Sequence, residues 1–190
     1  MKGKIPRMNK IKIVALFGKS GAGKDAIQKR IASSNTYHSI ISCTTRPARE
    51  NEKNGVNYFF LTNDEFAEKV MNYEMLESTS FRGWYYGTSL DSLDQDEINI
   101  GVFNIAGIRI MMDDPRLDVL PICIDAPNKI RLIRSLNREE NPDCAEICRR
   151  FQTDEADFRT IDFDYETVKN IDLSPAIEEV QKIIKYYYSI

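Results

Sequence analysis

The sequence has few residues that bind soft metals. Its 190 residues include one histidine and four cysteines, and no two cysteines form a CxxC pair. A structural zinc site is therefore not expected, and the pattern is typical of free thiols in a reducing compartment. No apolar run approaches the roughly 20 residues that cross a bilayer, and residues 1–10 lack the apolar stretch of a signal peptide. We expect a cytoplasmic protein that does not bind membranes.

The sequence also lacks a large net charge. It has 26 Lys and Arg against 29 Asp and Glu, which gives a net charge of -3 and argues against a dedicated nucleic-acid binder. The length, with 42% hydrophobic and 29% charged residues, is that of one soluble domain. We expect a flexible basic tail over 1–10 and a single domain over 11–190. A monomer or weak homodimer is expected.

The first element is predicted to be a buried strand. The run IKIVALF (11–17) is almost continuously apolar and β-branched, as in a parallel sheet covered on both faces. After it, Ile27 and Ile31 stand four apart, which predicts a helix ending near Ser33. Two further strands are predicted at 98–103 and 117–125, although Pro121 weakens the second. This alternation predicts an α/β fold.

Two segments interrupt the alternation. Residues 43–92 read as an inserted α+β unit, with a helix begun by the capping box of Thr62 and Glu65. Residues 127–160 are helical in character and rich in arginine among acids, a pattern that is usually a solvated helix face. A last helix is predicted after Ser174 as N-cap, with Pro175 at its first position.

The octapeptide GKSGAGKD (18–25) has the spacing of a phosphate-binding loop, G-x-x-x-x-G-K-[ST], except for its last residue. In such a loop, backbone N–H groups and the following helix dipole bind anionic oxygens, and Lys24 would contact the β and γ phosphates. The strand before it and the helix after it supply the context that the motif requires. The candidate ATP-binding residues here are Lys19, Ser20, Gly21, Ala22, Gly23, Lys24 and Asp25.

Asp25 replaces the hydroxyl residue that normally contacts Mg²⁺. A carboxylate also suits this hard cation, so Asp25 is the candidate metal ligand. The alternative is that Asp25 caps the helix start, where a carboxylate is favoured electrostatically. Because a bare carboxylate would repel phosphate, the functional interpretation requires the metal.

A second polar constellation lies in the inserted unit. Arg46 and Arg49 stand three apart within residues 42–58, and guanidinium groups bind phosphate bidentately. Glu77 and the stretch YYGT (85–88) offer hydrogen bonds and stacking for a base. The alternatives are a basic turn and an ordinary surface acid.

The order of these motifs resembles guanylate kinase, from about Ile11 to Tyr187. The resemblance implies a P-loop kinase fold, with a parallel five-stranded core sheet flanked by helices (11–41, 93–126 and 161–190). It also implies an inserted monophosphate-binding unit (42–92) and a helical lid (127–160). The family motif S-x-T-T-R-x-x-R-x-x-E-x-x-G-x-x-Y is matched by Ser42, Thr44, Thr45, Arg46, Arg49, Glu52, Gly55 and Tyr58.

The resemblance also implies roles for individual residues. A carboxylate accepts from the N1–H and 2-amino groups of guanine while a hydroxyl donates to O6, so both features favour guanine over adenine. The implied GMP-binding residues are Ser42, Arg46, Arg49, Tyr58, Glu77, Tyr86, Gly87, Thr88 and Asn104. On the donor side, the resemblance adds Arg134, Arg138 and Asn170 to the ATP site. The implied catalytic residues are Lys24, Arg46, Arg138 and Arg150, with Arg150 preferred to Arg149 as the third lid arginine.

Two positions depart from the family pattern. Asp25 stands on the phosphate loop, and Asn104 stands where the family has an aspartate near the nucleotide and its magnesium. We interpret the pair as a compensating exchange of one carboxylate; drift in a weakened enzyme is the alternative.

The resemblance implies Mg²⁺-dependent transfer of phosphate from ATP to GMP or dGMP. Two alternatives stay open: a deoxynucleoside monophosphate kinase of other or broader specificity, and a non-catalytic binding module.

Overall fold

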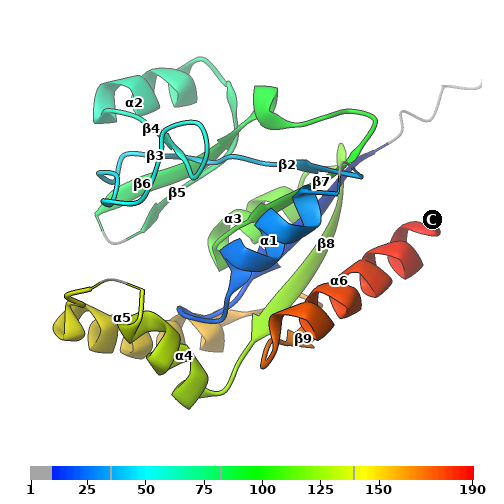
Figure 1. The fold of residues 1–190 in the computed structure, drawn as a ribbon. Coiled ribbons are helices and arrows are strands. Elements are labelled where there is room, and N and C mark those ends of the chain that lie inside the picture. The colour runs from blue at the N-terminus through cyan, green and yellow to red at the C-terminus, as the bar shows by residue number, and fades with distance from the viewer. Residues whose placement is uncertain (1–9, 35, 82, 139) are drawn as a thin grey trace, which may run out of the picture.

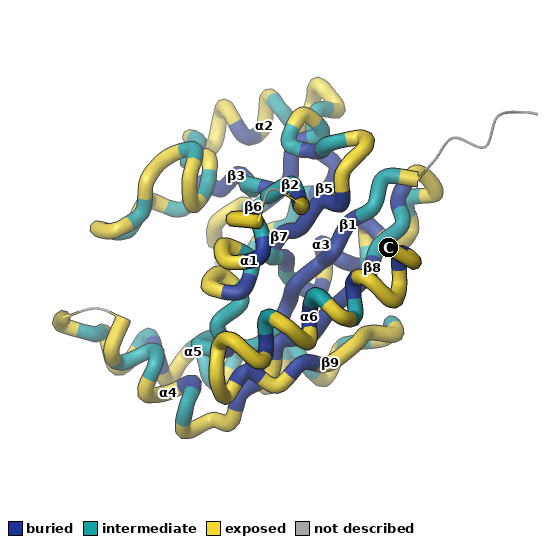
Figure 2. Tube along the Cα trace, turned by 45° about the vertical axis from the view of Figure 1, so that its right-hand side comes forward, coloured by how far each residue is buried: buried dark blue, intermediate teal, exposed yellow. Residues whose placement is uncertain are grey.

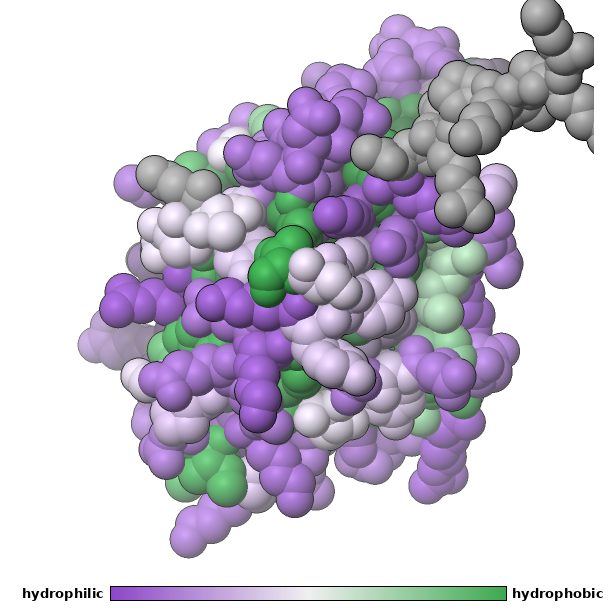
Figure 3. Space-filling model, turned by 90° about the vertical axis from the view of Figure 1, so that its right-hand side faces the viewer, coloured by the Kyte–Doolittle hydropathy of each residue, from purple (hydrophilic) through white to green (hydrophobic). Residues whose placement is uncertain are grey.

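A computed structural model describes residues 10–34, 36–81, 83–138 and 140–190. The predicted basic tail, apart from Lys10, lies outside these residues. All four cysteines lie within the described part of the chain and are free. Within the same part, no helix is long and apolar enough to span a bilayer. The face seen in Figure 3 is mainly hydrophilic, with apolar side chains scattered between polar ones.

A five-stranded parallel sheet forms the core, which confirms the predicted α/β class. Its order is β2 (Tyr37–Ser39), β7 (Ile98–Val102), β1 (Ile11–Phe17), β8 (Leu117–Asp125) and β9 (Glu166–Lys169). Strand β8 forms despite Pro121, because its pairing with β9 begins only at Ile122. At Pro121 the strand still has a free edge, where a missing N–H is tolerated.

Helices cover both faces of this sheet (Figure 1). Alternate residues of β1 divide between two apolar clusters, as the period of a strand requires. Val14 and Leu16 pack with α1 (Lys24–Ala32) and α6 (Leu173–Tyr188). Ile13 and Ala15 pack with α3 (Ile105–Met112) on the other face. In Figure 2 this central strand is buried from its third residue, Ile13, to its end at Phe17.

The last helix begins at Leu173 and not at Pro175, so its predicted start is wrong. Helix α6 begins at Leu173 with Asp172 as N-cap, so Ser174 does not cap it and Pro175 is its third residue. The N–H groups of a helix's first turn have no intrahelical partner, so a proline at this position costs no hydrogen bond.

The inserted segment contains a second sheet, with the order β4 (Phe59–Phe60), β3 (Cys43–Thr44), β6 (Trp84–Ser89) and β5 (Met75–Phe81). Helix α2 (Asn63–Met71) packs on it and begins with the predicted capping box of Thr62 and Glu65. A 3-10 turn, η1 (Leu90–Ser92), follows β6.

Residues 127–160 form α4 (Asn128–Leu136), α5 (Cys144–Asp157) and the short η2 (Phe158–Thr160). Figure 1 shows α4 and α5 on the opposite side of the molecule from the inserted sheet.

Candidate functional site: an arginine-lined cleft

One cleft of about 1070 Å³ is lined by the phosphate-loop segment, the inserted unit and the lid helices. The strands β1 and β7 end at this cleft, since Phe17 and Val102 line it. Ligands of open α/β sheets bind at the carboxyl ends of strands, so the cleft is where the fold favours a site. The predicted residues that line it are Ser20, Gly21, Gly23, Lys24, Asp25, Ser42, Arg46, Arg49, Tyr58, Glu77, Tyr86, Gly87, Asn104, Arg134, Arg138 and Arg150.

Two glycines let the phosphate loop pass close to its neighbours. At Gly21 the backbone has φ +77, and a Cβ atom would lie 2.4 Å from the carbonyl oxygen of Arg131. At Gly23, which caps α1 with φ +93, a Cβ atom would lie 2.4 Å from Nδ2 of Asn170. Both positions therefore require glycine for conformation and for space.

Lys24 lies inside the curve of the loop. Its Nζ donates hydrogen bonds to the carbonyl oxygens of Gly18, at 2.7 Å, and Lys19, at 3.3 Å. Burial lowers the pKa of Lys24, and the nearby carboxylates of Asp25 and Asp154 oppose that shift. The ammonium group is thus positioned by the loop's own backbone.

Asp25 is an exposed residue in the first turn of α1. The N-cap of α1 is Gly23, so Asp25 does not cap the helix, but its place in the first turn is favoured electrostatically, as the alternative interpretation held. Within the described residues, no hydrogen bond or ion pair engages its carboxylate. Its oxygens are therefore available to the cleft.

The two arginines of the inserted unit share one carboxylate. Nη2 of Arg46 donates to both oxygens of Glu52, at 3.0 and 2.8 Å, and the amide of Arg49 donates to Glu52 at 2.9 Å. The Arg46 guanidinium also lies 5.6 Å from the centre of the Tyr58 ring. Burial raises the pKa of Tyr58 to about 12, so its hydroxyl keeps its proton as a donor. Two cations and a phenol hydroxyl thus face one region of the cleft.

Glu77 lies deeper in the inserted unit and is 6% exposed. Its Oε1 accepts from Oγ1 of Thr88 at 2.9 Å, and Oγ of Ser42 lies 3.4 Å from that hydroxyl. The Cβ of a residue replacing Gly87 would lie 2.7 Å from the carbonyl oxygen of Glu77, which brings the two strands close together. Burial raises the pKa of Glu77 to about 7, while the bond from Thr88 opposes that shift. Glu77 and Ser42 therefore line the cleft, with the fully buried hydroxyl of Thr88 beside them.

Asn104 is the N-cap of α3. Its Oδ1 accepts from the amide of Gly107 at 2.7 Å, and its Nδ2 donates to Oγ1 of Thr79 at 2.6 Å. A Cβ atom on Gly107 would lie 2.9 Å from Oε2 of Glu77 and 3.4 Å from Oδ1 of Asn104. The amide of Asn104 and the carboxyl of Glu77 are therefore neighbours. Thr79 was not predicted, because a threonine in a strand carries no distinguishing sequence signal.

The lid arginines also share a carboxylate. Glu146 accepts from Nε of Arg149 at 2.6 Å and from Nε of Arg150 at 2.7 Å, which lowers its pKa to about 2. Burial lowers the pKa of Arg49, and the charges of Arg46, Arg138 and Arg150 lower it further. The arginines of the lid and of the inserted unit therefore line one cleft, close enough for their charges to act on each other.

Arg134 and Asn170 both contact the carbonyl oxygen of Ala22 in the phosphate loop. Arg134 donates to the carbonyl oxygens of Asn170, at 3.0 Å, and Ile171, at 2.9 Å, while Nδ2 of Asn170 donates to the carbonyl oxygen of Ala22 at 2.7 Å. Oδ1 of Asn170 is buried and has no hydrogen-bond partner among the described residues. Asn170 does not line the cleft, so the predicted contact of this side chain with ATP is not seen in the lining.

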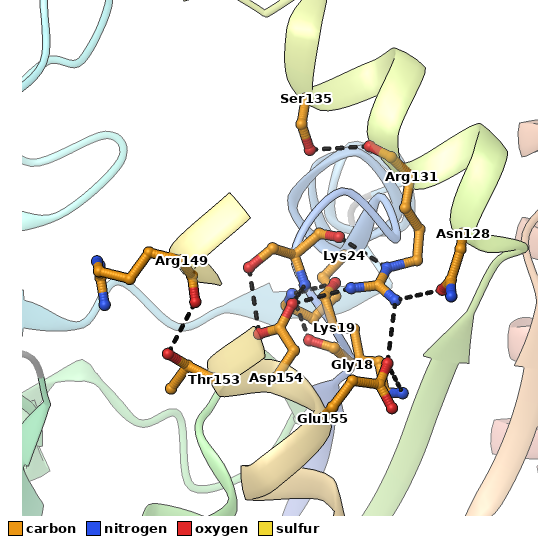
Figure 4. A network of polar contacts seen from close by, with 11 residues as sticks. Gly18, Lys19, Lys24, Asn128, Arg131, Ser135, Arg149, Thr153, Asp154 and Glu155 are labelled. Atoms are coloured by element: carbon orange, nitrogen blue, oxygen red, sulfur yellow. Dashed lines mark hydrogen bonds and ion pairs between the residues drawn. The ribbon is translucent and has the colours of Figure 1, made fainter. Parts of the chain in front are cut away.

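Sequence reasoning missed a second layer beneath the loop. Arg131, read as part of a solvated charge run, is 1% exposed and pairs with Asp154 at 2.9 Å (Figure 4). Asp154 in turn accepts from the amide of Ser20 at 2.7 Å. Their separation of 23 residues across two helices gives no local pattern from which the pair could be predicted.

Several known proteins resemble this chain in sequence or fold. Residues 10–187 match the family model described as guanylate kinase. The chain is 30% identical to a guanylate kinase of Mycoplasmoides gallisepticum, over 92% of each chain. It is 32% identical to one of Synechococcus sp., over 94% of this chain and 84% of that one. The crystal structure of guanylate kinase from Anaplasma phagocytophilum shares the fold with a TM-score of 0.70, at 19% identity over 95% and 88% of the two chains.

Proposed function

The chain belongs to the guanylate kinase family, and we propose that its cleft transfers the γ-phosphoryl group of ATP to GMP or dGMP. The phosphate loop and the lid would hold ATP, and the inserted unit would hold the monophosphate. The observation that carries this proposal is that Arg138 and Arg150 of the lid line the same cleft as Arg46 and Arg49 of the inserted unit. Positive charge on both sides of the cleft would stabilise the γ-phosphate of ATP and the phosphate of GMP when they lie close together for transfer.

The acceptor is proposed to bind in two parts. Its phosphate would contact Arg46, Arg49 and Tyr58, with Glu52 holding both arginines in place before binding. Its base would offer N1–H and the 2-amino group to Glu77, and the hydroxyl of Thr88 would turn away from Glu77 to donate to O6. Adenine would leave both side chains mispaired, so the pocket favours guanine.

Phosphoryl transfer needs mainly positioning and positive charge. Lys24, held by the loop's carbonyl oxygens, is proposed to contact the β and γ phosphates. Arg138 and Arg150 would add charge to the moving group, which requires Arg150 to leave Glu146 when the phosphates bind. Because these arginines complete the site only with both substrates present, little ATP should be hydrolysed without an acceptor.

The residues present also fit a magnesium ion. Asp25 offers an unengaged carboxylate beside Lys24, and carboxylate oxygen is a preferred magnesium ligand. Among the described residues no group of three acidic, histidine or cysteine side chains could hold a metal alone. An ion here would therefore take most ligands from phosphate and water. Mg²⁺ would neutralise charge on the β and γ phosphates.

The reaction can be tested by measuring ADP release with GMP, dGMP, AMP, UMP and dTMP, with and without Mg²⁺. We expect activity with GMP and dGMP, and little with the other three. GMP binding without ATP binding would contradict the proposal and favour a binding module.

A broader acceptor range is the second candidate. Asn104 places an uncharged amide beside Glu77, where the family has a carboxylate. Comparable rates with AMP, UMP or dTMP would support it. A cytoplasmic location and a monomeric or weakly dimeric state stay predictions.

A further inference from the structure

We propose that Asp154 is a positioning residue for the donor phosphate loop, and that its ion pair with Arg131 couples this loop to the lid helices. The proposal rests on the proposed role of the loop as the ATP site. It concerns residues that no sequence motif contains.

The carboxylate of Asp154 binds the loop directly. It lies on α5, is 8% exposed, and accepts from the amide of Ser20 at 2.7 Å through Oδ2. Its other oxygen, Oδ1, accepts from Oγ of Ser20 at 3.3 Å. One lid carboxylate therefore engages both the backbone and the side chain of a single loop residue, which fixes the orientation of that peptide.

Arg131 holds the same residue from the other side. Its Nε donates to the carbonyl oxygen of Ser20 at 2.9 Å, and its Nη2 donates to Oδ2 of Asp154 at 2.9 Å. Nη1 donates to Oδ1 of Asn128 at 2.8 Å, and the guanidinium lies 4.4 Å from the centre of the Phe151 ring. A buried guanidinium with these partners has no freedom to move independently of the loop. Figure 4 shows Arg131 and Asp154 pointing toward each other from α4 and α5 beside the loop.

The backbone of α4 also touches the loop. A Cβ atom at Gly21 would lie 2.4 Å from the carbonyl oxygen of Arg131 and 2.8 Å from Oγ of Ser135. Gly21 immediately follows Ser20, so two consecutive loop residues are fixed by lid elements. The end of the lid near the loop and the first half of the loop therefore form one packed unit.

This unit connects ATP binding with the lid arginines. Arg150 precedes Asp154 by four residues, about one turn of α5, so the anchor at Asp154 also sets where Arg150 lies. A loop held in its binding shape before ATP arrives loses less conformational freedom on binding. Removing the anchor should therefore weaken ATP binding and leave GMP binding nearly unchanged.

The alternative is that the pair serves stability alone. Leaving one partner of a buried ion pair without the other is strongly destabilising, whereas replacing both by apolar residues of similar volume is often neutral. The double variant R131M/D154L therefore separates the two roles: it removes the buried charges together with the acceptor for Ser20.

The test compares D154A, R131M/D154L and the control D64N, an exposed aspartate of α2. We measure thermal unfolding and the KM values for ATP and GMP in each full-length variant, with ADP binding by calorimetry as a second readout. D154A should unfold at a lower temperature and raise KM for ATP about 10-fold, since a bond to a charged acceptor is lost. The double variant should regain thermal stability yet keep the raised KM for ATP and the weakened ADP binding. Both variants should change KM for GMP less than about 2-fold, and D64N should match the wild type.

A double variant with normal stability and a normal KM for ATP would overturn the proposal, as would D154A with an unchanged KM for ATP. A wild-type protein that binds no ATP would instead overturn the proposed function, so the two failures are distinguishable.

Discussion

The hydroxyl of Thr88 donates a 2.9 Å hydrogen bond to Oε1 of Glu77, inside a pocket that leaves this carboxyl group 6% exposed. Burial raises the pKa of Glu77 to about 7, and the bond from Thr88 opposes the rise only in part. Near neutral pH the free protein therefore contains both protonated and ionised Glu77. A guanine base binds the ionised form, because its N1–H and 2-amino groups both donate.

GMP binding should therefore weaken as the pH falls. The group is ionised above its raised pKa, so binding is at full strength there and is progressively lost below about 7. Between about pH 8 and pH 6 we expect KM for GMP to rise about 10-fold, since roughly a tenth of Glu77 is ionised one unit below its pKa. The measurement is KM for GMP across this range, with saturating ATP.

The control is Glu77→Gln. This variant should bind GMP weakly at every pH, and its KM for GMP should not show the rise that we attribute to protonation of Glu77. Titration of the GMP phosphate affects both proteins alike. A wild-type profile parallel to that of the variant would contradict this prediction.

Arg46 should matter for the acceptor rather than the donor. It is held by two contacts with Glu52, so the cation is oriented toward the cleft before phosphate arrives. Arg46→Ala should raise KM for GMP about 10- to 100-fold, the effect of losing a hydrogen bond to a charged group. KM for ATP should change less than about 3-fold. Arg116→Ala removes an exposed arginine paired with Asp114 and serves as the control. Normal GMP binding by Arg46→Ala would show that the phosphate clamp is misassigned.

The parallel core could be predicted because its signals are local. The apolar run 11–17, the glycine loop and the helix after it are contiguous, and the capping box of Thr62 and Glu65 appears as predicted. The short strands β3 and β6 could not be predicted as strands: β3 has two residues, and the residues of β6 read as a binding stretch. Their pairing depends on contacts across about 40 residues of chain.

For the site too, local signals could be predicted from the sequence and contacts between distant residues could not. Arg46 and Glu52 both belong to the motif on which the resemblance rests, and the structure pairs them. The partners that hold the loop could not be predicted, because Arg131 lies 111 residues after Ser20 and its burial depends on how two helices pack. A charged residue in a charged helix predicts exposure, and only the tertiary contact with Asp154 reverses that expectation.

Lys24 should affect turnover more than binding of the acceptor. Its Nζ is held by the carbonyl oxygens of Gly18 and Lys19, at the point where the phosphates of ATP are proposed to lie. Lys24→Ala should lower kcat about 100- to 1000-fold, as removal of a charge-stabilising donor does elsewhere, with KM for GMP within about 3-fold of wild type. Lys29→Ala, an exposed lysine in the last turn of the same helix, is the matched control. A kcat within about 3-fold of wild type for Lys24→Ala would remove this residue from the proposed transfer step.

Our interpretation of Asp25 and Asn104 as a compensating exchange of one carboxylate predicts a specific pattern of rescue. Asp25 places a free negative charge at the start of α1, which repels phosphate unless a cation lies between them. Asp25→Ser should therefore raise the Mg²⁺ concentration needed for half-maximal ADP binding, and without Mg²⁺ it should bind ADP more tightly than wild type. Adding Asn104→Asp to Asp25→Ser should restore part of the Mg²⁺ dependence, because it places a carboxylate at position 104, just after the end of β7. Calorimetric titration of ADP at a series of Mg²⁺ concentrations measures both effects, with Asp64→Asn as a control of the same charge change. If Asp25→Ser kept the wild-type Mg²⁺ dependence and rate, Asp25 would not act on the metal and the exchange would have no functional meaning.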